Sequence, residues 1–450
     1  MQKQTTSDLR VIIGLGITGL SCARYLAAKH IPFIVTDSRP EPPCLTEFQD
    51  EFPDTELHLG GFSASLLLNA KELIVSPGVS LAEPTIAACI NKGIPAIGDI
   101  ELFAREAKAP VVAITGTNAK GTVTTLVGEM AKAAGKNVRV GGNIGIPVLE
   151  LLQQHEPDLY VLEISSYQLE TTFSLNAAAA TILNLSEDHL DRYHTMQAYQ
   201  AAKQRVYHQC ESAIYNRDDN YTFPLNVAEN TVQINFGMDK AEGNNFGLIK
   251  KDDETWLAQG NQLILPVTEL QIHGVHNWIN ALAALAIGYS INLPMDAMIN
   301  ALKIFQGLPH RCQFVREIKG VNYYNDSKGT NVGATLAAIN SLGQTNKGKL
   351  ILIAGGLGKN ADFSPLRPAV ANYVRSVVLI GKDAPILENT LKDITQCINE
   401  DTMKNAVIHA QQIAQPNDAI LLSPACASLD MFNDYEHRGE VFAQIVKELE

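Results

Sequence analysis

The sequence predicts an α/β protein built from three domains with largely parallel sheets. Short apolar runs alternate with helical patterns along the chain, as expected for strands joined by crossover helices. Two glycine-containing loops each lie between an apolar run and a helical pattern. A chain of 450 residues accommodates about two to four domains. We expect the domains to cover residues 1–98, 99–306 and 307–450.

The first domain opens with a strand, a glycine loop and a helix. Leu9–Ile13 is apolar, Gly14–Gly19 has the spacing G-x-G-x-x-G, and Ser21–Lys29 has a helical pattern. Glycines at this spacing permit a tight turn and a close backbone approach to a pyrophosphate at the helix N-terminus. Asp37 lies where a carboxylate can meet a ribose or a base. Further strands are expected at Phe33–Val35 and Glu72–Val75.

This pattern predicts a Rossmann-like nucleotide-binding domain, for which NAD is the first ligand to consider. An NAD-dependent dehydrogenase is therefore one hypothesis. A tight strand-to-helix turn that binds nothing is another, because a fold does not fix a function.

The second domain begins with a strand and a reduced phosphate-binding loop. Val111–Ile114 is apolar, and the segment Thr115–Thr122 reads TGTNAKGT. Such a loop needs inward backbone N–H groups, a lysine for the terminal phosphates and a hydroxyl for Mg²⁺. The match to G-x-x-x-x-G-K-[ST] is incomplete, because Ala119 precedes Lys120 and Gly121 follows it. We predict a P-loop ATPase-like parallel sheet.

Acidic and imidazole groups follow two other strands of this domain. Glu163 closes the apolar run Leu159–Leu162, and Glu187-Asp188-His189 follows the run Ala180–Leu183. On one sheet edge, Glu163 and His189 could hold Mg²⁺, although this ion prefers oxygen ligands. A loop histidine with a local hydrogen bond is the alternative for His189.

The remaining elements complete the second and third domains. Residues 225–272 combine short alternating runs without a long helix, which predicts a small antiparallel excursion before a helix at Asn277–Ser290. After Gly307-Leu308-Pro309 the alternation resumes and predicts a second Rossmann-like domain. The other strands are expected at Ala213–Tyr215, Val321–Tyr324, Leu350–Ala354, Val377–Ile380 and Ala419–Leu422.

Composition excludes several classes of partner. The net charge is −13 and no run of Lys or Arg provides a basic face, which argues against nucleic acid and anionic membranes. Seven cysteines occur without a Cys-x-x-Cys pair, so neither a zinc site nor a disulfide framework is indicated. The chain begins without a signal-peptide pattern and contains no membrane-spanning run. We expect a cytoplasmic protein.

Several segments, in order along nearly the whole chain, resemble the Mur ligases, which bind ATP and form amide bonds. The resembling segments are TGTNAK at 115–120, LSEDHLD at 185–191, HNWINA at 276–281, GLPHR at 307–311, NDSKGTN at 325–331 and SPACAS at 423–428. The first glycine loop, GGNIG at 141–145 and SLD at 428–430 resemble the member of the family that adds D-glutamate.

The resemblance implies an ATP-dependent acid–amino-acid ligase of peptidoglycan precursor synthesis. Its small-molecule substrates would be UDP-N-acetylmuramoyl-L-alanine, D-glutamate and ATP, and the reaction would pass through an acyl phosphate and release ADP and phosphate. We expect a monomer. A ligase adding another amino acid, a folate polyglutamate synthetase and a non-catalytic nucleotide sensor stay as alternatives.

The resemblance also implies a role for individual residues. The first domain would bind UDP instead of NAD, and the UDP-substrate residues would be Ile17, Thr18, Asp37, Ser38, Arg39, Asn143 and His189. The ATP site would comprise Gly116, Thr117, Asn118, Ala119, Lys120, Gly121, Thr122, Asn277, Asn280, Arg311 and Asp326. D-glutamate would meet Thr330, Lys359, Ser428, Leu429 and Tyr435, with Lys328 in the same pocket.

The implied catalytic residues are Lys120, His189, Lys203 and Lys328. Two Mg²⁺ ions would be held by Thr122, Glu163, His189 and Lys203. Lys203 would carry a carbamate derived from CO₂, which turns an ammonium into a carboxylate. Judged from its helical surroundings alone, Lys203 would be a solvated residue.

The sequence departs from the family pattern at several loop positions. Gly121 stands where Ser is usual, and loss of that hydroxyl costs about 0.5–1.5 kcal/mol unless water or Thr122 replaces it. The other departures are Ala119 for Gly, Gly329 for Ala, Leu357 for Asp and Tyr435 for Phe.

Overall fold

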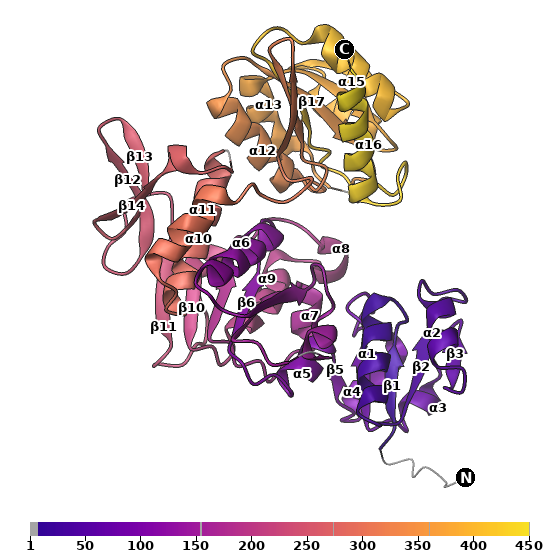
Figure 1. Cartoon of the computed structure of the whole chain (residues 1–450). Coiled ribbons are helices and arrows are strands. Elements are labelled where there is room, and N and C mark those ends of the chain that lie inside the picture. The colour runs from indigo at the N-terminus through magenta and orange to yellow at the C-terminus, as the bar shows by residue number, and fades with distance from the viewer. Residues whose placement is uncertain (1–7, 154, 273, 360, 450) are drawn as a thin grey trace. The chain divides into compact units, whose positions relative to one another are not determined.

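The computed structural model describes residues 8–153, 155–272, 274–359 and 361–449. It divides into two compact units, whose helices and strands are labelled in Figure 1. The first unit comprises the chain up to Leu185, His189–Thr268 and Ala281–Lys303, and the second comprises Ser186–Asp188, Glu269–Asn280 and the chain from Ile304. Two sheets lie in the first unit and one in the second. The predicted mixed α/β class with largely parallel sheets is confirmed.

The first sheet is entirely parallel, with strand order β3-β2-β1-β4-β5. Val11, Ile12 and Ile13 of the central strand are fully buried, which explains their continuous apolar run. The strands are β1 (Arg10–Ile13), β2 (Phe33–Asp37), β3 (Leu57–Leu59), β4 (Glu72–Val75) and β5 (Ala96–Ile97). The helices are α1 (Ile17–Ala28), α2 (Leu45–Glu51), α3 (Ala64–Leu67), α4 (Pro84–Asn91) and α5 (Asp99–Ala104).

The first unit also holds the largest sheet, with order β14-β13-β12-β11-β10-β9-β6-β8-β7. Its strands are β6 (Val111–Thr115), β7 (Val138–Gly142), β8 (Leu159–Glu163), β9 (Ala179–Ile182), β10 (Ser212–Asn216), β11 (Val232–Phe236), β12 (Phe246–Lys251), β13 (Glu254–Gln259) and β14 (Gln262–Pro266). The α-helices are α6 (Lys120–Ala133), α7 (Ser166–Glu170), α8 (Leu190–Tyr193), α9 (Met196–Gln204), α10 (Val275–Ser290) and α11 (Met295–Ile304); the part of α10 up to Asn280 and the last residue of α11 belong to the second unit. Short 3₁₀ turns cover Val148–Gln153, Arg205–Tyr207, Asn220–Thr222 and Val267–Glu269.

The antiparallel excursion is smaller than the sequence predicts. β12, β13 and β14 pair antiparallel, as expected. β11 instead pairs parallel with β10, with Ile234 opposite Ile214. Ile234 and Phe236 are buried while Val232 and Gln233 are exposed, and this alternation resembles that of an antiparallel edge. The prediction for residues 225–272 is therefore wrong at this strand.

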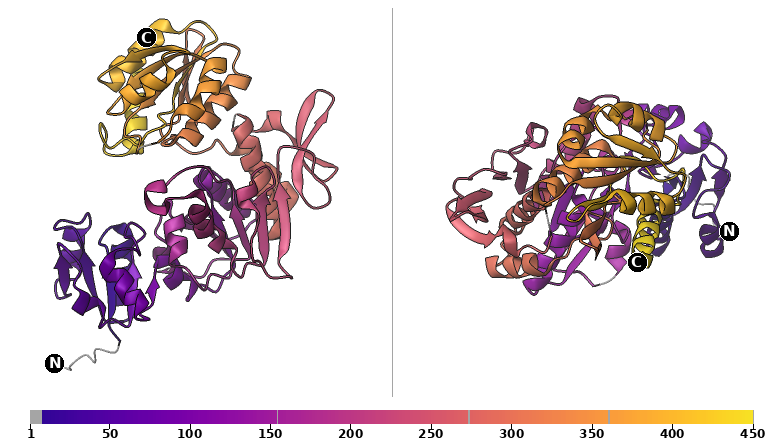
Figure 2. Two further views of the ribbon diagram at one scale, coloured as in Figure 1. Left: turned by 180° about the vertical axis from the view of Figure 1, so that it is seen from behind. Right: turned by 90° about the horizontal axis from the view of Figure 1, so that it is seen from above.

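The second unit contains a six-stranded sheet of order β15-β16-β20-β17-β18-β19, parallel except for β15. Its strands are β15 (Gln313–Ile318), β16 (Val321–Asn325), β17 (Leu350–Gly355), β18 (Val374–Ile380), β19 (Gln396–Asn399) and β20 (Ala419–Leu422). Its helices are α12 (Val332–Thr345), α13 (Arg367–Tyr373), α14 (Ala384–Leu391), α15 (Met403–Ile413) and α16 (Tyr435–Glu448), with a 3₁₀ turn at Ser364–Leu366. Figure 2 shows helices on both faces of this sheet.

No helix in the described ranges is long and apolar enough to cross a membrane. All seven cysteines are free thiols.

α5 follows the first sheet directly and is bonded to the loop after α7. Glu101 accepts hydrogen bonds from the N–H groups of Phe173 (2.7 Å) and Ser174 (2.9 Å). Asp99 Oδ2 accepts one from Gln168 Nε2 (2.9 Å), whereas its buried Oδ1 has no hydrogen-bond partner. Burial raises the pKa of Asp99 to about 6, against the opposing effect of the Gln168 hydrogen bond. The ionised carboxylate is thus destabilising.

Replacing Asp99 with asparagine is expected to stabilise the protein at neutral pH. Between pH 3.8 and about 6 the folded chain keeps a proton that the unfolded chain loses, so Asp99 lowers stability as pH rises through this window. The shift corresponds to roughly 3 kcal/mol at pH 7.5. Urea unfolding of both proteins at pH 4 and 7.5 checks this. A stability difference that does not grow with pH would contradict it.

Candidate active site

The glycine loop of the first sheet is shaped by two of its glycines. Gly14 has φ +97°, and a Cβ on it would lie 2.9 Å from Ser76 Cβ; a Cβ on Gly19 would lie 1.9 Å from Gly14 O. Gly16 faces open space, with no atom within 4 Å of an added Cβ. The neighbouring Ile17 is 71% exposed at the start of α1, and Thr18 is half-buried. The loop thus packs tightly at its base and is accessible at its tip.

Asp37 is fully engaged by protein donors. Its Oδ2 accepts from Leu15 N (2.7 Å) and Arg39 Nη2 (2.7 Å), and its Oδ1 accepts from Arg39 N (2.8 Å) and Nε (2.9 Å). Burial alone would raise the pKa of Asp37, but the hydrogen bonds from Arg39 and Leu15 lower it below its ordinary value. A carboxylate has about four acceptor positions. Asp37 therefore fixes the glycine loop and Arg39, while Ser38 is exposed beside it.

The loop between β6 and α6 wraps around the lysine at its end. Gly116 has φ +151°, and a Cβ there would lie 3.2 Å from Leu183 Cβ. Lys120 Nζ donates to Gly116 O (3.0 Å) and Thr117 O (2.9 Å). Gly121 and Thr122 are buried in the first turn of α6. The loop thus curves around the Lys120 ammonium with its own carbonyls, with Ala119 and Gly121 on either side of the lysine.

Asn184 supports this loop, although the sequence analysis did not single it out. Its Oδ1 accepts from Asn118 N (2.8 Å), its Nδ2 donates to Asn118 O (3.1 Å), and its own carbonyl accepts from Thr117 N (2.9 Å). Its position could have indicated this contact, because it lies two residues after β9, the strand next to β6. A polar residue there reaches the adjacent loop.

Ala119 carries backbone strain, with φ +65° and ψ −2°. A left-handed conformation costs a non-glycine residue about 1–2 kcal/mol, while glycine adds about 0.4–1 kcal/mol of unfolded-state entropy. We expect Ala119→Gly to stabilise the protein by about 0.5 kcal/mol, measured by urea unfolding. Ala201→Gly, at an exposed position in α9, should instead cost about 1 kcal/mol. Equal losses in both variants would contradict the assignment of strain.

Glu163 lies at the carboxyl end of β8 with one oxygen occupied. Oε1 accepts from Asn143 Nδ2 (2.7 Å), whereas the buried Oε2 has no hydrogen-bond partner. The Asn143 segment is fixed because Asn143 N donates to Glu163 O (2.8 Å), and a Cβ on Gly142 would lie 2.4 Å from that oxygen. A buried carboxylate oxygen without a donor is a suitable ligand for a hard cation.

Lys203 is 2% exposed, so its interpretation as a solvated helix residue is wrong. Its Nζ donates to Thr115 Oγ1 (3.2 Å) and lies 5.0 Å from the Tyr199 ring centroid. Thr115 follows Ile114, which pairs with Glu163 across β6 and β8. The amine of Lys203 and the carboxylate of Glu163 therefore reach neighbouring strand ends at one edge of the sheet.

Tyr199, which the sequence did not indicate, contacts Lys203, the lysine loop and His189. Its hydroxyl is 3.2 Å from Thr117 Oγ1, and its ring packs edge-on to His189 with a centroid distance of 6.1 Å. His189 has φ +55°, and its Nδ1 lies 2.7 Å from Tyr167 Oη. Both predicted alternatives for His189 thus remain compatible with the contacts. Over the described residues, no cluster of three or more His, Cys, Asp or Glu could hold a metal.

The second unit holds the other predicted nucleotide-contacting residues. Asn277 and Asn280 are buried near the start of α10, and Asn280 Nδ2 donates to Asn277 Oδ1 (2.9 Å). Asp326 accepts from Ser423 Oγ (2.7 Å) and Cys312 N (3.1 Å). Burial raises the pKa of Asp326 to about 6, against these hydrogen bonds and the charge of Arg311.

Lys328 and Tyr435, both predicted near the amino acid, are in contact. Lys328 Nζ lies 3.6 Å from the centroid of the Tyr435 ring, which is a close cation–π contact. The hydroxyl that distinguishes Tyr435 from the usual Phe donates to Glu436 Oε1 (2.7 Å). The hydroxyl that this departure adds therefore has a hydrogen-bond partner on the neighbouring residue.

The remaining predicted residues of this pocket differ in exposure. Ser428 is buried, Thr330 is half-buried, and Lys359 and Leu429 are exposed. Leu357, another departure, forms two backbone hydrogen bonds with Ala427, each 2.9 Å, which ties the loop after β17 to the one after β20.

Arg438 anchors three segments that carry these residues, and its role was not foreseen. It is 1% exposed, and it donates to Ser327 O (2.8 Å), Ser327 Oγ (3.0 Å) and Cys426 O (3.1 Å). Ser327 Oγ in turn donates to Tyr435 O (2.7 Å). Burial lowers the pKa of Arg438 to about 10. The sequence pattern places an arginine on α16 at the surface, so it gives no indication that Arg438 is buried.

Three protein-family models match successive parts of the chain. They describe the N-terminal domain of MurD-like Mur ligases at residues 8–98, the Mur ligase middle domain at 114–288 and the Mur ligase glutamate ligase domain at 310–426.

Curated relatives and solved structures agree with these matches. UDP-N-acetylmuramoylalanine–D-glutamate ligase from Coxiella burnetii is 54% identical over 445 residues, covering 99% of this chain and 100% of the relative. The protein of the same name from Pseudomonas aeruginosa is 52% identical over 444 residues, covering 99% of each. A pseudomurein peptide ligase type C from Methanothermus fervidus shares the fold, with TM-score 0.62 and 20% identity over 98% of this chain and 100% of that one.

Proposed function

The chain belongs to the Mur ligase family, and we propose that it is the ATP-dependent ligase that joins D-glutamate to UDP-N-acetylmuramoyl-L-alanine. Two relatives named for this reaction are more than half identical to it and align along almost its full length. The product is an amide of a peptidoglycan precursor, formed with release of ADP and phosphate.

The structural observation that carries the proposal is the sheet edge formed by β6, β8 and β9. There the lysine loop ends at Lys120, Glu163 presents an unpaired oxygen, and buried Lys203 reaches Thr115. A loop of this form with adjacent acceptor groups is suited to phosphoryl transfer, which depends chiefly on positioning and on fixed charge.

The same groups suit Mg²⁺. The unpaired Oε2 of Glu163 fits a cation, and we assign Thr122, His189 and carbamylated Lys203 as its other ligands or those of a second ion. A carbamate would give the buried Lys203 side chain the charge of a carboxylate, which supplies oxygen ligands where unmodified lysine has only donors. When bound, Mg²⁺ supplies positive charge that offsets the repulsion among the anionic reactants.

The alanyl carboxylate is a poor electrophile for an amine, so it has to be activated first. The alanyl carboxylate attacks the γ-phosphorus of ATP, which gives an acyl phosphate and ADP. The amine of D-glutamate then attacks the acyl carbon, and phosphate leaves from the tetrahedral intermediate. Lys120 would hold the terminal phosphates of ATP, and Lys328 would counter the negative charge of glutamate.

We assign the other predicted residues to the same substrates. ATP is assigned Gly116, Thr117, Asn118, Ala119, Gly121, Asn277, Asn280, Arg311 and Asp326. The UDP substrate is assigned Ile17, Thr18, Asp37, Ser38, Arg39, Asn143 and His189. D-glutamate is assigned Thr330, Lys359, Ser428, Leu429 and Tyr435.

The proposed domain limits are 1–98, 99–306 and 307–450. We further propose that the protein is a cytoplasmic monomer; free cysteines are typical of a reducing compartment such as the cytoplasm.

The alternatives have less support. An NAD-dependent dehydrogenase would need only the first glycine loop and would leave the lysine loop after β6 unexplained. A nucleotide sensor with the altered Ala119 and Gly121 would bind ATP and release no phosphate in any substrate mixture.

Phosphate release from ATP tests the proposal, in the presence of Mg²⁺, bicarbonate and UDP-N-acetylmuramoyl-L-alanine. We expect release that requires D-glutamate and does not occur with L-glutamate. Release with another amino acid would indicate a sibling ligase. No release from the folded protein in any mixture would support the sensor.

A further inference from the structure

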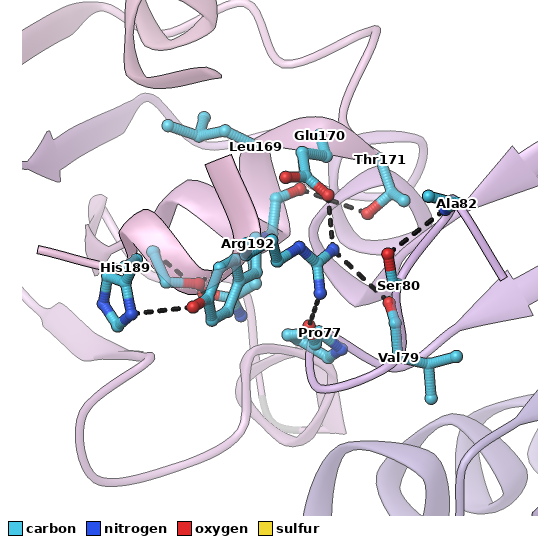
Figure 3. A network of polar contacts seen from close by, with 12 residues as sticks. Pro77, Val79, Ser80, Ala82, Leu169, Glu170, Thr171, His189 and Arg192 are labelled. Atoms are coloured by element: carbon cyan, nitrogen blue, oxygen red, sulfur yellow. Dashed lines mark hydrogen bonds and ion pairs between the residues drawn. The ribbon is translucent and has the colours of Figure 1, made fainter. Parts of the chain in front are cut away.

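Arg192 lies between the first sheet and the α7 segment, and none of the roles assigned above uses it. It belongs to α8, the four-residue helix that begins directly after His189. Its side chain is 15% exposed and pairs with Glu170 Oε2. Figure 3 shows the guanidinium between Glu170 and the backbone of Pro77 and Val79.

On one side, Arg192 holds the loop that follows β4. Its Nη1 donates to Pro77 O (3.3 Å) and its Nη2 to Val79 O (3.4 Å). That loop supports the glycine loop, because Ser76 Oγ donates to Gly14 O (2.9 Å). A Cβ on Gly14 would also meet Val79 Cγ2 at 3.2 Å. A movement of the glycine loop would therefore be transmitted to the carbonyls that Arg192 binds.

On the other side, Arg192 contacts the residue that orients His189. Its guanidinium carbon lies 4.4 Å from the centroid of the Tyr167 ring. The Tyr167 hydroxyl lies 2.7 Å from His189 Nδ1, and the two rings pack edge-on at 4.9 Å. Glu170, the ion-pair partner, lies on the same short helix as Tyr167. The orientation of Tyr167, and hence of His189, depends on where Arg192 lies.

We propose that Arg192 is a positioning residue that couples occupancy of the UDP-substrate loop to the placement of His189. This rests on the proposed function. Arginine suits the role because its planar group can donate to two carbonyls and a carboxylate while stacking on an aromatic ring. Lysine could pair with Glu170 but has a single nitrogen, so it would not reproduce this geometry.

Steady-state kinetics provide the first test. For Arg192→Met we expect the KM for UDP-N-acetylmuramoyl-L-alanine to rise at least about tenfold and kcat to fall about tenfold, with the KM for D-glutamate within twofold. Arg192→Lys should restore only part of either loss. Arg217→Met is the matched control, because Arg217 is 17% exposed and also bonds a carboxylate and two main-chain carbonyls. It should leave all three constants within twofold.

The coupling itself is read by NMR without ATP, on protein with ¹³C-labelled histidine. The His189 signal is assigned through His189→Gln. UDP is the probe, because it lacks the muramoyl-alanine part that would contact His189 directly. In the wild type, UDP should shift this signal; in Arg192→Met, bound UDP should not shift it. Tyr167→Phe, which keeps the ring but removes the hydroxyl, should also lose the shift while the KM for the UDP substrate stays near that of the wild type.

A shift in Arg192→Met equal to that of the wild type would overturn the proposal, as would kinetic losses of equal size in Arg217→Met. Failure of the proposed function is recognised separately. In that case the wild type would show no D-glutamate-dependent phosphate release, whereas binding and the His189 signal could still be followed with UDP as the probe.

Discussion

Lys120→Ala is expected to reduce turnover by about a thousandfold or more while the UDP substrate still binds. Lys120 Nζ donates to the carbonyls of Gly116 and Thr117, so its ammonium lies within the curve of the loop after β6. Removing it takes away two hydrogen bonds that hold the loop, together with the fixed positive charge that we propose for the terminal phosphates. A single fixed cation in phosphoryl transfer is worth about 10³–10⁵ in rate.

Binding of the UDP substrate should persist in this variant, because the glycine loop Gly14–Gly19 belongs to another sheet. Phosphate release measures the turnover of the variant, and titration calorimetry measures its binding of the UDP substrate. Lys132→Ala is the control: Lys132 lies at the far end of the same helix, is exposed, and pairs with Glu129. Simultaneous loss of turnover and of UDP-substrate binding in Lys120→Ala would count against separate sites.

Arg438→Met is expected to give the largest loss of stability. The variant leaves the carbonyls of Ser327 and Cys426 without their buried donor, and Ser327 Oγ, which still donates to Tyr435 O, loses the Arg438 donor. A buried carbonyl left without its donor costs about 1–3 kcal/mol, so the loss of both should cost about 3–5 kcal/mol. Because Arg438 ties together the segments that carry Lys328, Ser428 and Tyr435, the KM for D-glutamate should also rise by at least about tenfold.

Urea unfolding measures the stability, and kinetics at saturating UDP substrate measure the KM. Arg316→Met provides the comparison in the same unit. Arg316 donates to two main-chain carbonyls, Lys447 O and Leu449 O, but it is exposed, so its loss should cost less than about 1 kcal/mol. If the two variants were equally stable, Arg438 would not be the anchor that its contacts indicate.

The parallel strands and the loops at their ends could be predicted from sequence because their signals are local. Val11–Ile13 forms a continuous apolar run, and the glycines before α1 have a fixed spacing. The first glycine loop, the lysine loop and Glu163 all lie directly after such strands. Elements with a weak pattern were missed. β5 has two residues, and β15 and β19 are mostly exposed or half-buried, so neither has an apolar run.

The burial of polar groups could not be predicted in the same way. Lys203 and Arg438 each lie on a helix of mixed polarity, and a helical pattern alone places a charged residue on the solvated face. Their burial is set by partners distant in sequence, Thr115 for the first and Ser327 and Cys426 for the second. Asn184 and Tyr199 act likewise through contacts with the lysine loop. Such contacts follow from topology and have no local signature.

If ATP activates the alanyl carboxylate and D-glutamate then captures it, oxygen from that carboxylate must pass to phosphate. UDP-N-acetylmuramoyl-L-alanine labelled with ¹⁸O in both carboxylate oxygens tests this transfer, with phosphate and product analysed by mass spectrometry. We expect each phosphate released to carry one ¹⁸O and the amide product to retain the other. Unlabelled phosphate, or labelled phosphate without a D-glutamate amide, would contradict it.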